Sequence, residues 1–228
     1  MKPAIVRNIR RADAQVIGAL GQHGVATVHE AQARSGLMRP YMRPIYPSAR
    51  AAGSAVTVLC APGDNLMIHA AIEVCKAGDV LVVTTTSEST DGMFGELLAV
   101  SARAHGAIGL IIDAGVRDVA DLTKMEFPVW SKAVSAQGTV KATAGSVNVP
   151  IMAAGALVHP GDVVVADVDG VVIVPRERAS EVVRLGEERL VKEEKSRQRL
   201  RNGDLGLDFY GLRAKLTELG VQWIDGAE

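Results

Sequence analysis

The chain has 228 residues, of which 48% are hydrophobic and 22% are charged, and its formal net charge is −1. This length supports one domain with a substantial core, and the charge creates no field that would attract nucleic acid or an anionic membrane. The first residues, MKPAIVRNIRRADAQ, carry charges where a signal peptide needs an apolar core, and no apolar stretch is long enough to span a membrane. Two cysteines are too few for a cysteine-rich zinc site or a disulfide scaffold. We therefore expect a cytoplasmic protein with reduced thiols.

The first half of the chain alternates between predicted helices and strands. We expect a helix over residues 9–21, a turn at Gly24, and an irregular segment over residues 39–47, whose three prolines exclude a regular helix. The elements predicted after this segment are a strand at 54–59, a helix from Asp64 or Asn65 to about Lys76, a strand at 80–85, a helix ending near His105, a strand at 108–112 and a short helix ending near Lys124. This alternation predicts an α/β fold.

The second half begins as a β-rich segment and ends in helices. Short apolar runs separated by glycine-bearing turns predict strands at 129–134, 147–152, 163–166 and 171–174. A charged helical pattern covers residues 176–201, and a short helix is expected over 208–219. We predict a single domain over residues 1–228, in which about 176–228 form a C-terminal helical extension.

A glycine-rich turn, Asp91-Gly92-Met93-Phe94-Gly95-Glu96, lies between a predicted strand and a predicted helix. Its glycines allow backbone N–H groups to converge at the start of the helix, where the helix dipole also favours an anion. A carboxylate or phosphate would fit there. Ordinary tight turns have the same composition, so this motif alone leaves both interpretations open.

A second motif, Arg117-Asp118, follows directly after a predicted buried strand. Ligands of α/β proteins gather at the carboxyl ends of strands. Arginine can bind a carboxylate or an enolate oxygen through two hydrogen bonds, and aspartate can hold a hard divalent cation. The alternative is that Asp118 caps the next helix beside a surface arginine.

Together these motifs resemble a known family. Glu96, followed after twenty residues by Arg117-Asp118, resembles the acidic-x20-Arg-Asp signature of the class II pyruvate aldolases that act on 4-hydroxy-4-methyl-2-oxoglutarate and 4-carboxy-4-hydroxy-2-oxoadipate. The regulator of ribonuclease activity A has the same scaffold. Segments 63–69, 95–99, 112–118 and 161–167 also resemble segments of this family. The first acidic position of the signature is often aspartate, and here it is Glu96, which is longer by one methylene.

The resemblance implies an architecture and an assembly. The family fold is an α/β/β sandwich similar to the phosphohistidine swivelling domain, assembled as trimers or hexamers with active sites between subunits. The C-terminal extension at about 176–228 would then contact a neighbouring subunit and donate Glu193, or the adjacent Glu194, to its site. From the residues alone, the run Lys192-Glu193-Glu194-Lys195 is typical of a solvated helix face.

The resemblance also implies a reaction and its site residues. The enzyme would cleave 4-carboxy-4-hydroxy-2-oxoadipate, or 4-hydroxy-4-methyl-2-oxoglutarate, to pyruvate plus oxaloacetate or pyruvate in protocatechuate- and gallate-type aromatic degradation, with oxaloacetate decarboxylation as a side activity. Asp118 would bind Mg²⁺ or Mn²⁺, Glu96 would hold metal-bound waters, Arg117 would stabilise the enolate, and Glu193 would assist proton removal. The expected substrate-binding residues are Gly95, Glu96, Leu97, Leu98, Arg117 and Lys141.

Other candidates carry weaker signals. Lys141 could line the site or form a Schiff base, although its polar neighbours argue against the lowered pKa that a Schiff base needs. Arg39, Tyr41 and Arg43 could bind a distal carboxylate or make a surface contact. The five histidines contain no His-x-x-x-His pair, so no histidine metal site is expected. The segment 167–170 resembles the start of a calcium loop but lacks the later ligands, so a hairpin turn is expected.

Two alternatives to the aldolase remain open. One is a binding protein on the same scaffold that inhibits a ribonuclease and catalyses nothing, because a fold does not fix a function. The other is a dedicated oxaloacetate decarboxylase, which would differ in the distal part of the pocket. The presence of Glu96, Arg117, Asp118 and Glu193 favours an enzyme over a regulator. The expected partners are therefore a small keto acid and further copies of the chain.

Overall fold

The computed structural model of the chain describes residues 2–226. The chain divides into two compact units, Met1–Gly186 and Glu187–Glu228. The boundary lies within helix α5 (Ala179–Arg201), whose early residues Ala179 and Val182 are buried in the first unit. The first unit contains every strand, and its architecture is the α/β/β sandwich that was predicted.

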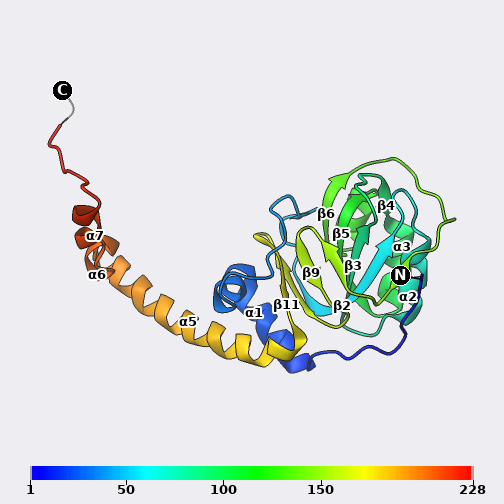
Figure 1. Cartoon of the computed structure of the whole chain (residues 1–228), viewed down its shortest axis with the longest axis horizontal. Coiled ribbons are helices and arrows are strands. Elements are labelled where there is room, and N and C mark those ends of the chain that lie inside the picture. Colours follow the sequence, from blue (N-terminus) through cyan, green and yellow to red (C-terminus); the bar gives the residue numbers. More distant parts are fainter. Residues whose placement is uncertain (1, 227–228) are drawn as a thin grey trace. The chain divides into compact units, whose positions relative to one another are not determined.

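The first unit is built on one central mixed sheet (Figure 1). Its strands, in spatial order, are β1 (Arg43–Pro44), β6 (Val129–Val134), β5 (Ala107–Val116), β3 (Asp79–Thr85), β2 (Ala51–Cys60), β10 (Val163–Asp167) and β11 (Gly170–Val174), with β4 (Gly92–Phe94) paired to β5 and β7 (Ser146–Val147) paired to β2. Strands β2, β3, β5 and β6 run parallel, whereas β10 and β11 are antiparallel to their neighbours. The carboxyl ends of four strands therefore meet at one edge.

Both faces of this sheet are covered, which explains why β3 and β5 are almost continuously apolar. Helices α2 (Leu66–Val74), α3 (Glu96–Ala104) and α4 (Val119–Lys124) pack on one face, where Val83, Ile112 and Ile68 are fully buried. The hairpin β8 (Ile151–Ala153)–β9 (Ala156–Val158) and residues 38–49 cover the other face around Val82 and Trp130. In Figure 1, α2 and α3 flank the sheet on the side away from β9.

Helix α1 (Ala14–Ala31) packs on β10 and β11 through Leu20 and Val28. The predicted helix over 9–21 starts too early, whereas the turn predicted at Gly24 is present as a break in α1. Asp13 sets the actual start, because its side chain accepts the N–H of Gln15. Gly24 interrupts the helical conformation, with φ 77° and ψ 165°, but a second helical segment, not predicted, follows directly after it. The helix resumes because Asp167 Oδ2 accepts the N–H of Val25 at 2.9 Å, a contact between residues 142 positions apart.

Several strand predictions need correction. The predicted strand at 147–152 is divided into β7 and β8, because Asn148 between them has a positive φ of 57°. Strand β9 was not predicted, and β2 begins at Ala51 rather than at 54 because its first residues are small and carry little strand signal. The proline-rich segment is irregular as expected, apart from the two residues of β1.

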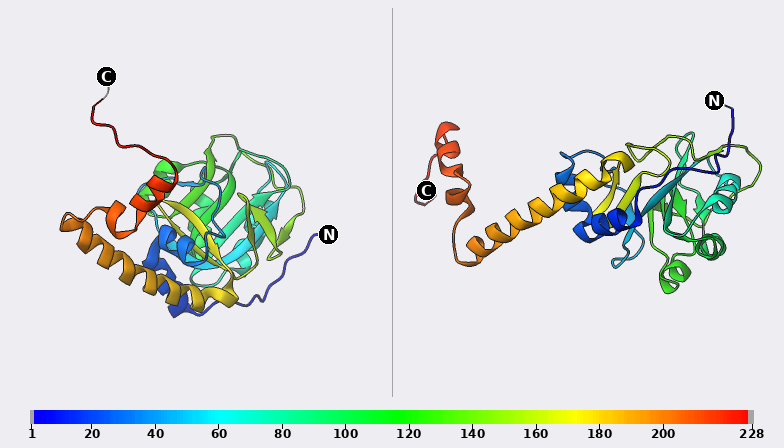
Figure 2. Two further views of the ribbon diagram at one scale, coloured as in Figure 1. Left: turned by 60° about the vertical axis from the view of Figure 1, so that its left-hand side comes forward. Right: turned by 90° about the horizontal axis from the view of Figure 1, so that it is seen from below.

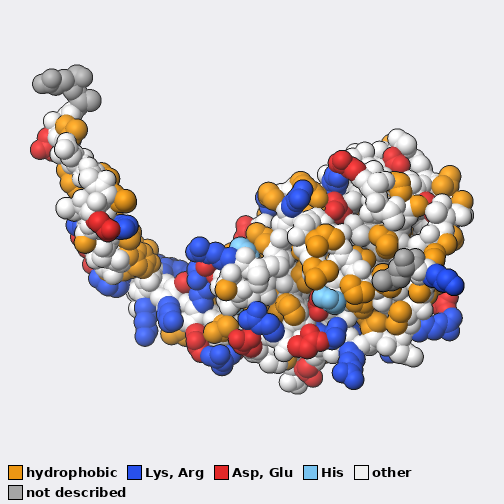
Figure 3. All heavy atoms as spheres, viewed as in Figure 1, with side chains coloured by type: hydrophobic (Ala, Val, Ile, Leu, Met, Phe, Trp, Pro, Cys, Tyr) orange, Lys and Arg blue, Asp and Glu red, His pale blue; other side chains and the backbone are white. Residues whose placement is uncertain are grey.

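The second unit contains the later turns of α5, then α6 (Gly206–Phe209) and α7 (Leu212–Glu218). Both views in Figure 2 show α5 as one continuous helix, and charged side chains crowd along it in Figure 3. A 3₁₀ turn, η1 (Arg176–Arg178), precedes it. The single helix predicted over 208–219 was wrong, because Gly211 has a left-handed φ of 68° and separates α6 from α7. Among the described residues, no helix is long and apolar enough to cross a membrane.

Candidate active site

A cavity of about 190 Å³ lies where the turn before α3, the exit of β5 and the start of α2 come together. It is lined by Asn65, His69, Gly92, Met93, Gly95, Leu97, Leu98, Arg117, Asp118 and Lys141. Six of the predicted site residues are in this set. Glu96 lies beside the cavity, half-buried, and does not line it. The structure thus brings together residues that come from four separate segments of the chain.

Asp118 has an unusual backbone conformation at the exit of β5. It occupies the left-handed region, at φ 56° and ψ 36°, where an aspartate is tolerated better than most residues. It precedes α4, yet its side chain makes no capping hydrogen bond to that helix. Instead, Oδ2 accepts the backbone N–H of Glu96 at 3.1 Å and lies 3.7 Å from the Arg117 Nε atom. The alternative of a helix-capping aspartate is therefore wrong.

Gly95 is required at the start of α3 because the Arg-Asp pair passes directly over it. A Cβ atom at this position would lie 2.3 Å from Asp118 Oδ2 and 3.0 Å from Arg117 Cγ. Glu96 was expected to bind substrate, but its backbone N–H donates to Asp118 Oδ2 and is not free to bind a substrate carboxylate. The N–H groups of Leu97 and Leu98 precede the first intrahelical hydrogen bond, from Ala99 N to Gly95 O at 3.1 Å, so they can receive an anion.

Asn65, which directly precedes α2, and His69 within α2 complete the cavity, and sequence reasoning missed both. Asn65 is 6% exposed, its Nδ2 donates to Met93 O at 3.1 Å, and its Oδ1 has no hydrogen-bond partner among the described residues. His69 follows one helical turn later. Partial burial and the charge of Lys141 lower the pKa of His69, so its ring is neutral near pH 7. The available signal was the spacing of four residues, which places both on one face of a helix.

The cavity favours an anionic ligand. Arg117 and Lys141 are its cations, and the side chain of Arg117 is 46% exposed, so its guanidinium remains accessible. The amino-terminal end of α3 adds the positive end of a helix dipole. Asp118 is the carboxylate among the lining residues.

A second cavity, of about 370 Å³, also adjoins the Arg-Asp pair. Arg117 and Asp118 line both cavities, and Val119, Val134, Ser135 and Ala136 complete the second one. Its walls combine the charged pair and Ser135 with the apolar side chains of Val119, Val134 and Ala136. A ligand longer than a pyruvyl group can therefore extend past Arg117 into this space.

The oxygen donors near Asp118 fit a magnesium-like ion better than a zinc ion. Asp118 supplies a carboxylate and Asn65 supplies the unpartnered Oδ1 atom, and both residues line the cavity. In residues 2–226, no group of three or more His, Cys, Asp or Glu side chains could hold a metal ion. Mg²⁺ retains several water ligands and is commonly bound through one or two carboxylates, so this sparse donor set suits it.

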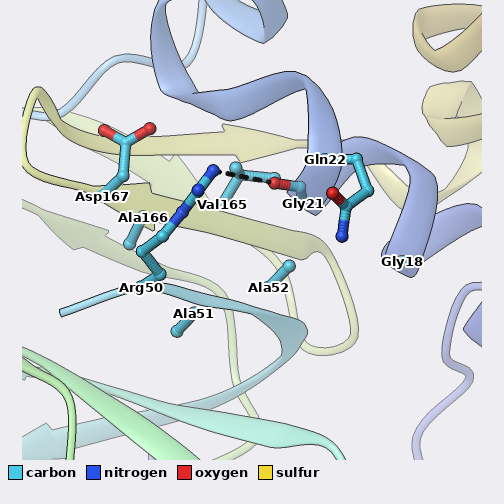
Figure 4. A pocket seen from close by; sticks show the side chains of 9 residues that line it. All are labelled: Gly18, Gly21, Gln22, Arg50, Ala51, Ala52, Val165, Ala166 and Asp167. Carbon is cyan, nitrogen blue, oxygen red and sulfur yellow. Dashed lines mark hydrogen bonds between the residues drawn. The ribbon is translucent and has the colours of Figure 1, made fainter. Parts of the chain in front are cut away.

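A further cavity, of about 340 Å³, lies between α1 and the edge of β2 and β10 (Figure 4). Small residues such as Gly18, Gly21 and Ala52 form most of its wall. Arg50 points toward the Gly21 carbonyl at 3.5 Å, and both carboxylate oxygens of Asp167 accept backbone N–H groups. These side chains stabilise the kink of α1, and the cavity has no group arranged for chemistry.

The residues of the proline-rich segment lie away from the Arg-Asp pair. Tyr41 donates a hydrogen bond to Asp113 Oδ1 at 2.9 Å, and burial together with this bond raises the pKa of Tyr41 to about 12. Arg39 and Tyr41 line a separate polar cavity, whereas Arg43 donates to the Asp169 carbonyl at 3.0 Å. Residues 167–170 form the expected hairpin turn between β10 and β11.

Glu193 belongs to the second unit. Its Oε1 atom lies 2.7 Å from the Arg189 Nε atom, one helical turn earlier on α5. The adjacent Glu194 pairs with Arg197. Glu193 and Glu194 are both half-exposed at the side chain. The donation of Glu193 to the site of a neighbouring subunit stays a prediction.

Some known proteins similar to this chain are named as putative aldolases, and others are named as members of a ribonuclease inhibitor family. A Halalkalibacterium halodurans protein named "Putative 4-hydroxy-4-methyl-2-oxoglutarate aldolase" is 26% identical over 169 residues, covering 74% of this chain and 80% of that protein. A Burkholderia multivorans protein of the same name is 32% identical over 148 residues, covering 64% and 90%. The crystal structure of Streptomyces coelicolor RraAS2, described as an unusual member of the RNase ES inhibitor RraA protein family, superposes with a TM-score of 0.74 at 26% identity, covering 84% and 100%.

The match to a family extends over most of the first unit. The model of the RraA-like family, described as Aldolase/RraA, matches residues 14–173. This span includes α1, the central sheet except the last residue of β11, and all residues that line the cavity at Asp118. The fold, with its mixed sheet and C-terminal helices, agrees with the superposition on RraAS2. The chain belongs to the RraA-like family.

Proposed function

We propose that this chain is a divalent-metal-dependent pyruvate aldolase. Its substrates would be 4-carboxy-4-hydroxy-2-oxoadipate and 4-hydroxy-4-methyl-2-oxoglutarate, cleaved to pyruvate plus oxaloacetate or pyruvate. The observation that carries the proposal is the hydrogen bond from Glu96 N to Asp118 Oδ2, which holds the Arg-Asp pair over the start of α3. The names of the related proteins support this substrate class.

The pyruvyl end of the substrate would bind in the cavity of about 190 Å³. The N–H groups of Leu97 and Leu98 would donate to its carboxylate, since they lie at the positive end of α3. Lys141 lines the same cavity and would bind a second anionic group. The remainder of the substrate would occupy the cavity between Val119 and Val134.

Asp118 would hold Mg²⁺ or Mn²⁺ directly, and Glu96 would hold waters of that ion through hydrogen bonds. When bound, the ion would supply Lewis-acid polarisation of the keto group. The protein's own contribution at this point is geometric, because the Glu96 N–H fixes one Asp118 oxygen and leaves the other available. The preorganised carboxylate would not need to reorient when a ligand binds.

Arg117 would donate hydrogen bonds to the keto oxygen of the substrate. Negative charge develops on that oxygen when the C3–C4 bond breaks, and a fixed guanidinium stabilises it. The backbone of Arg117 is held by a hydrogen bond from its N–H to Phe94 O at 2.9 Å. The C4 hydroxyl must lose its proton in the same step, and Glu193 of a neighbouring subunit is the proposed base. A site between subunits follows from this proposal, and we propose a trimer or hexamer as the assembly.

The proposal is tested by pyruvate release from 4-hydroxy-4-methyl-2-oxoglutarate, followed with a coupled dehydrogenase. We expect turnover with Mg²⁺ or Mn²⁺, no turnover after dialysis against EDTA, and recovery when the metal is restored. Oxaloacetate should lose CO₂ in the same site at a lower rate, because both reactions pass through the same pyruvate enolate. Absence of pyruvate release from both hydroxy-keto acids in the presence of metal would overturn the proposal.

The similarity to RraAS2 favours a second candidate, a binding protein that inhibits a ribonuclease without catalysis. A purified ribonuclease assay distinguishes the two functions. The aldolase proposal predicts that Asp118→Asn abolishes pyruvate release, whereas an inhibitor needs no particular charge at this residue. A dedicated oxaloacetate decarboxylase would release CO₂ but cleave neither hydroxy-keto acid.

A further inference from the structure

Asp64, which lines no described cavity, has a buried carboxylate that connects two walls of the proposed active site. The residue is 2% exposed. Its Oδ1 accepts the N–H of Leu66 at 2.9 Å, which lies at the start of α2. Its Oδ2 accepts the N–H groups of Ala142 at 2.8 Å and Thr143 at 2.6 Å, which follow directly after Lys141. One side chain therefore holds both the helix that carries Asn65 and the loop that carries Lys141.

The loop needs such an attachment because it has almost no regular structure. Residues 135–145 contain only an isolated bridge, between Val140 and Asp64, and Lys141, Ala142 and Thr143 are exposed. Two backbone hydrogen bonds fix the loop before Lys141, from Asn65 N to Val140 O and from Val140 N to Gly63 O, each at 3.0 Å. The bonds to Asp64 fix it after Lys141. Hydrogen bonds therefore hold the backbone on both sides of Lys141.

Burying a carboxylate is costly unless strong donors satisfy it, and three backbone N–H groups do so here. Burial raises the pKa of Asp64, but the bonds from Leu66, Ala142 and Thr143 outweigh it, and the net pKa is lowered. The carboxylate is therefore charged throughout the neutral range. An asparagine side chain at this position has only one acceptor oxygen, and its NH₂ group would face backbone N–H donors. It could not accept hydrogen bonds from both the start of α2 and the loop.

We propose that Asp64 is a positioning residue of the active site, which sets the location of the Lys141 ammonium group relative to Asn65 and His69 on α2. Lys141 is the cation proposed above for a second anionic group of the substrate, so this inference rests on the proposed function. Asp64 itself does not touch the substrate. Its effect is transmitted through the backbone at Ala142 and Thr143, because those two N–H groups are its contacts on the loop.

The test is a double-mutant cycle of Asp64→Asn and Lys141→Met, with kcat and KM measured for pyruvate release. Asp64→Asn should raise KM on the order of 10-fold with a smaller change in kcat, since a misplaced binding group loses much of its effect. In the Lys141→Met background, Asp64→Asn should produce little further change, because the group it positions is absent. An equal loss in both backgrounds would overturn the inference.

Asp162 provides a matched control. It is also 2% exposed, and its carboxylate also accepts two backbone N–H groups, from His159 at 2.8 Å and from Arg176 at 3.2 Å. It lines none of the described cavities. Asp162→Asn should lower the melting temperature as Asp64→Asn does, yet leave KM and kcat unchanged. If both variants change KM equally, the effect of Asp64 is only structural.

Hydrogen exchange measured by mass spectrometry tests the inference without an activity assay. In Asp64→Asn, peptides that cover residues 139–145 should exchange on the order of 10-fold faster than in the wild type, because the two hydrogen bonds from the loop to the Asp64 carboxylate are weakened. Asp64→Ser serves if the amide variant does not fold, since serine can still bond to Leu66 N at the helix start but is too short to hold the loop. Unchanged exchange over 139–145 would overturn the positioning role even if the aldolase proposal holds. Faster exchange in a chain without aldolase activity would refute the proposed function alone.

Discussion

The Asp118 carboxylate accepts the backbone N–H of Glu96 at 3.1 Å, and this single contact ties the exit of β5 to the start of α3. The two residues are 22 positions apart and belong to different elements. The contact consumes one donor of the helix terminus and fixes one carboxylate oxygen. It thereby converts two motifs that are separate in the sequence into one site.

This contact requires a glycine at position 95. We predict that Gly95→Ala keeps the fold but lowers kcat/KM on the order of 100-fold, because the added Cβ would lie 2.3 Å from Asp118 Oδ2 and must displace the Arg-Asp pair. Pyruvate release and thermal unfolding measure the two effects. Gly18→Ala is the matched control, since no atom lies within 4 Å of its added Cβ within α1. That variant should be stabilised by about 0.5–1 kcal/mol with unchanged activity.

Asp118→Asn separates the metal-binding role of this residue from its structural role. The amide keeps an oxygen that can accept the Glu96 N–H, so the turn should remain in place. The charge that binds a divalent cation is lost, and Mn²⁺ affinity, measured by electron paramagnetic resonance, should fall at least 10-fold. Pyruvate release should fall with it. Wild-type Mn²⁺ affinity in the variant would remove Asp118 as the ligand.

Arg117→Lys tests the stabilisation of charge on the keto oxygen. Lysine keeps the positive charge but loses the two parallel donors of a guanidinium. We expect kcat for aldol cleavage to fall on the order of 100-fold, the effect of removing one donor from an oxyanion-binding site. Exchange of the pyruvate methyl protons into D₂O, followed by NMR, should slow as well, because it needs the enolate but no C–C cleavage. Near-normal exchange would contradict this role for Arg117.

The pKa of His69 should report the charge of Lys141. Partial burial and the nearby ammonium group lower this pKa below its ordinary value of 6.5, since both disfavour the imidazolium form. An NMR titration should therefore show a midpoint below 6.5 for the signal that His69→Gln removes. In Lys141→Met the midpoint should rise, because one unfavourable charge is gone. A midpoint that does not move would place Lys141 too far from α2 to act in the same cavity.

Much of the fold is visible in the sequence because local pattern and tertiary structure agree there. The apolar runs of β3 and β5 predict buried parallel strands, and the Arg-Asp motif directly follows β5. The continuation of α1 beyond Gly24 depends on Asp167, a residue distant in sequence, so no local pattern could predict it. Asn65 and His69 were missed for the same reason, since only the packing of α2 against the turn before α3 brings them to the cavity. The left-handed conformation of Asp118 is likewise set by its contact with Glu96.

The proposed base, Glu193, is tested by mixing inactive subunits. Glu193→Gln and Asp118→Asn should each be nearly inactive, since each lacks one group that the reaction needs. If Glu193 acts across a subunit boundary, mixing the two variants under conditions that exchange subunits creates sites with both groups intact. At an equal mixture, about a quarter of the sites should be complete in a cyclic oligomer with independent sites. The activity should recover to the same fraction of the wild type, and native mass spectrometry shows whether subunits have exchanged.

Glu194→Gln is the control, because Glu194 neighbours Glu193 on α5 and pairs with Arg197. No recovery despite proven exchange would mean that Glu193 acts within its own chain or only pairs with Arg189 on the helix surface.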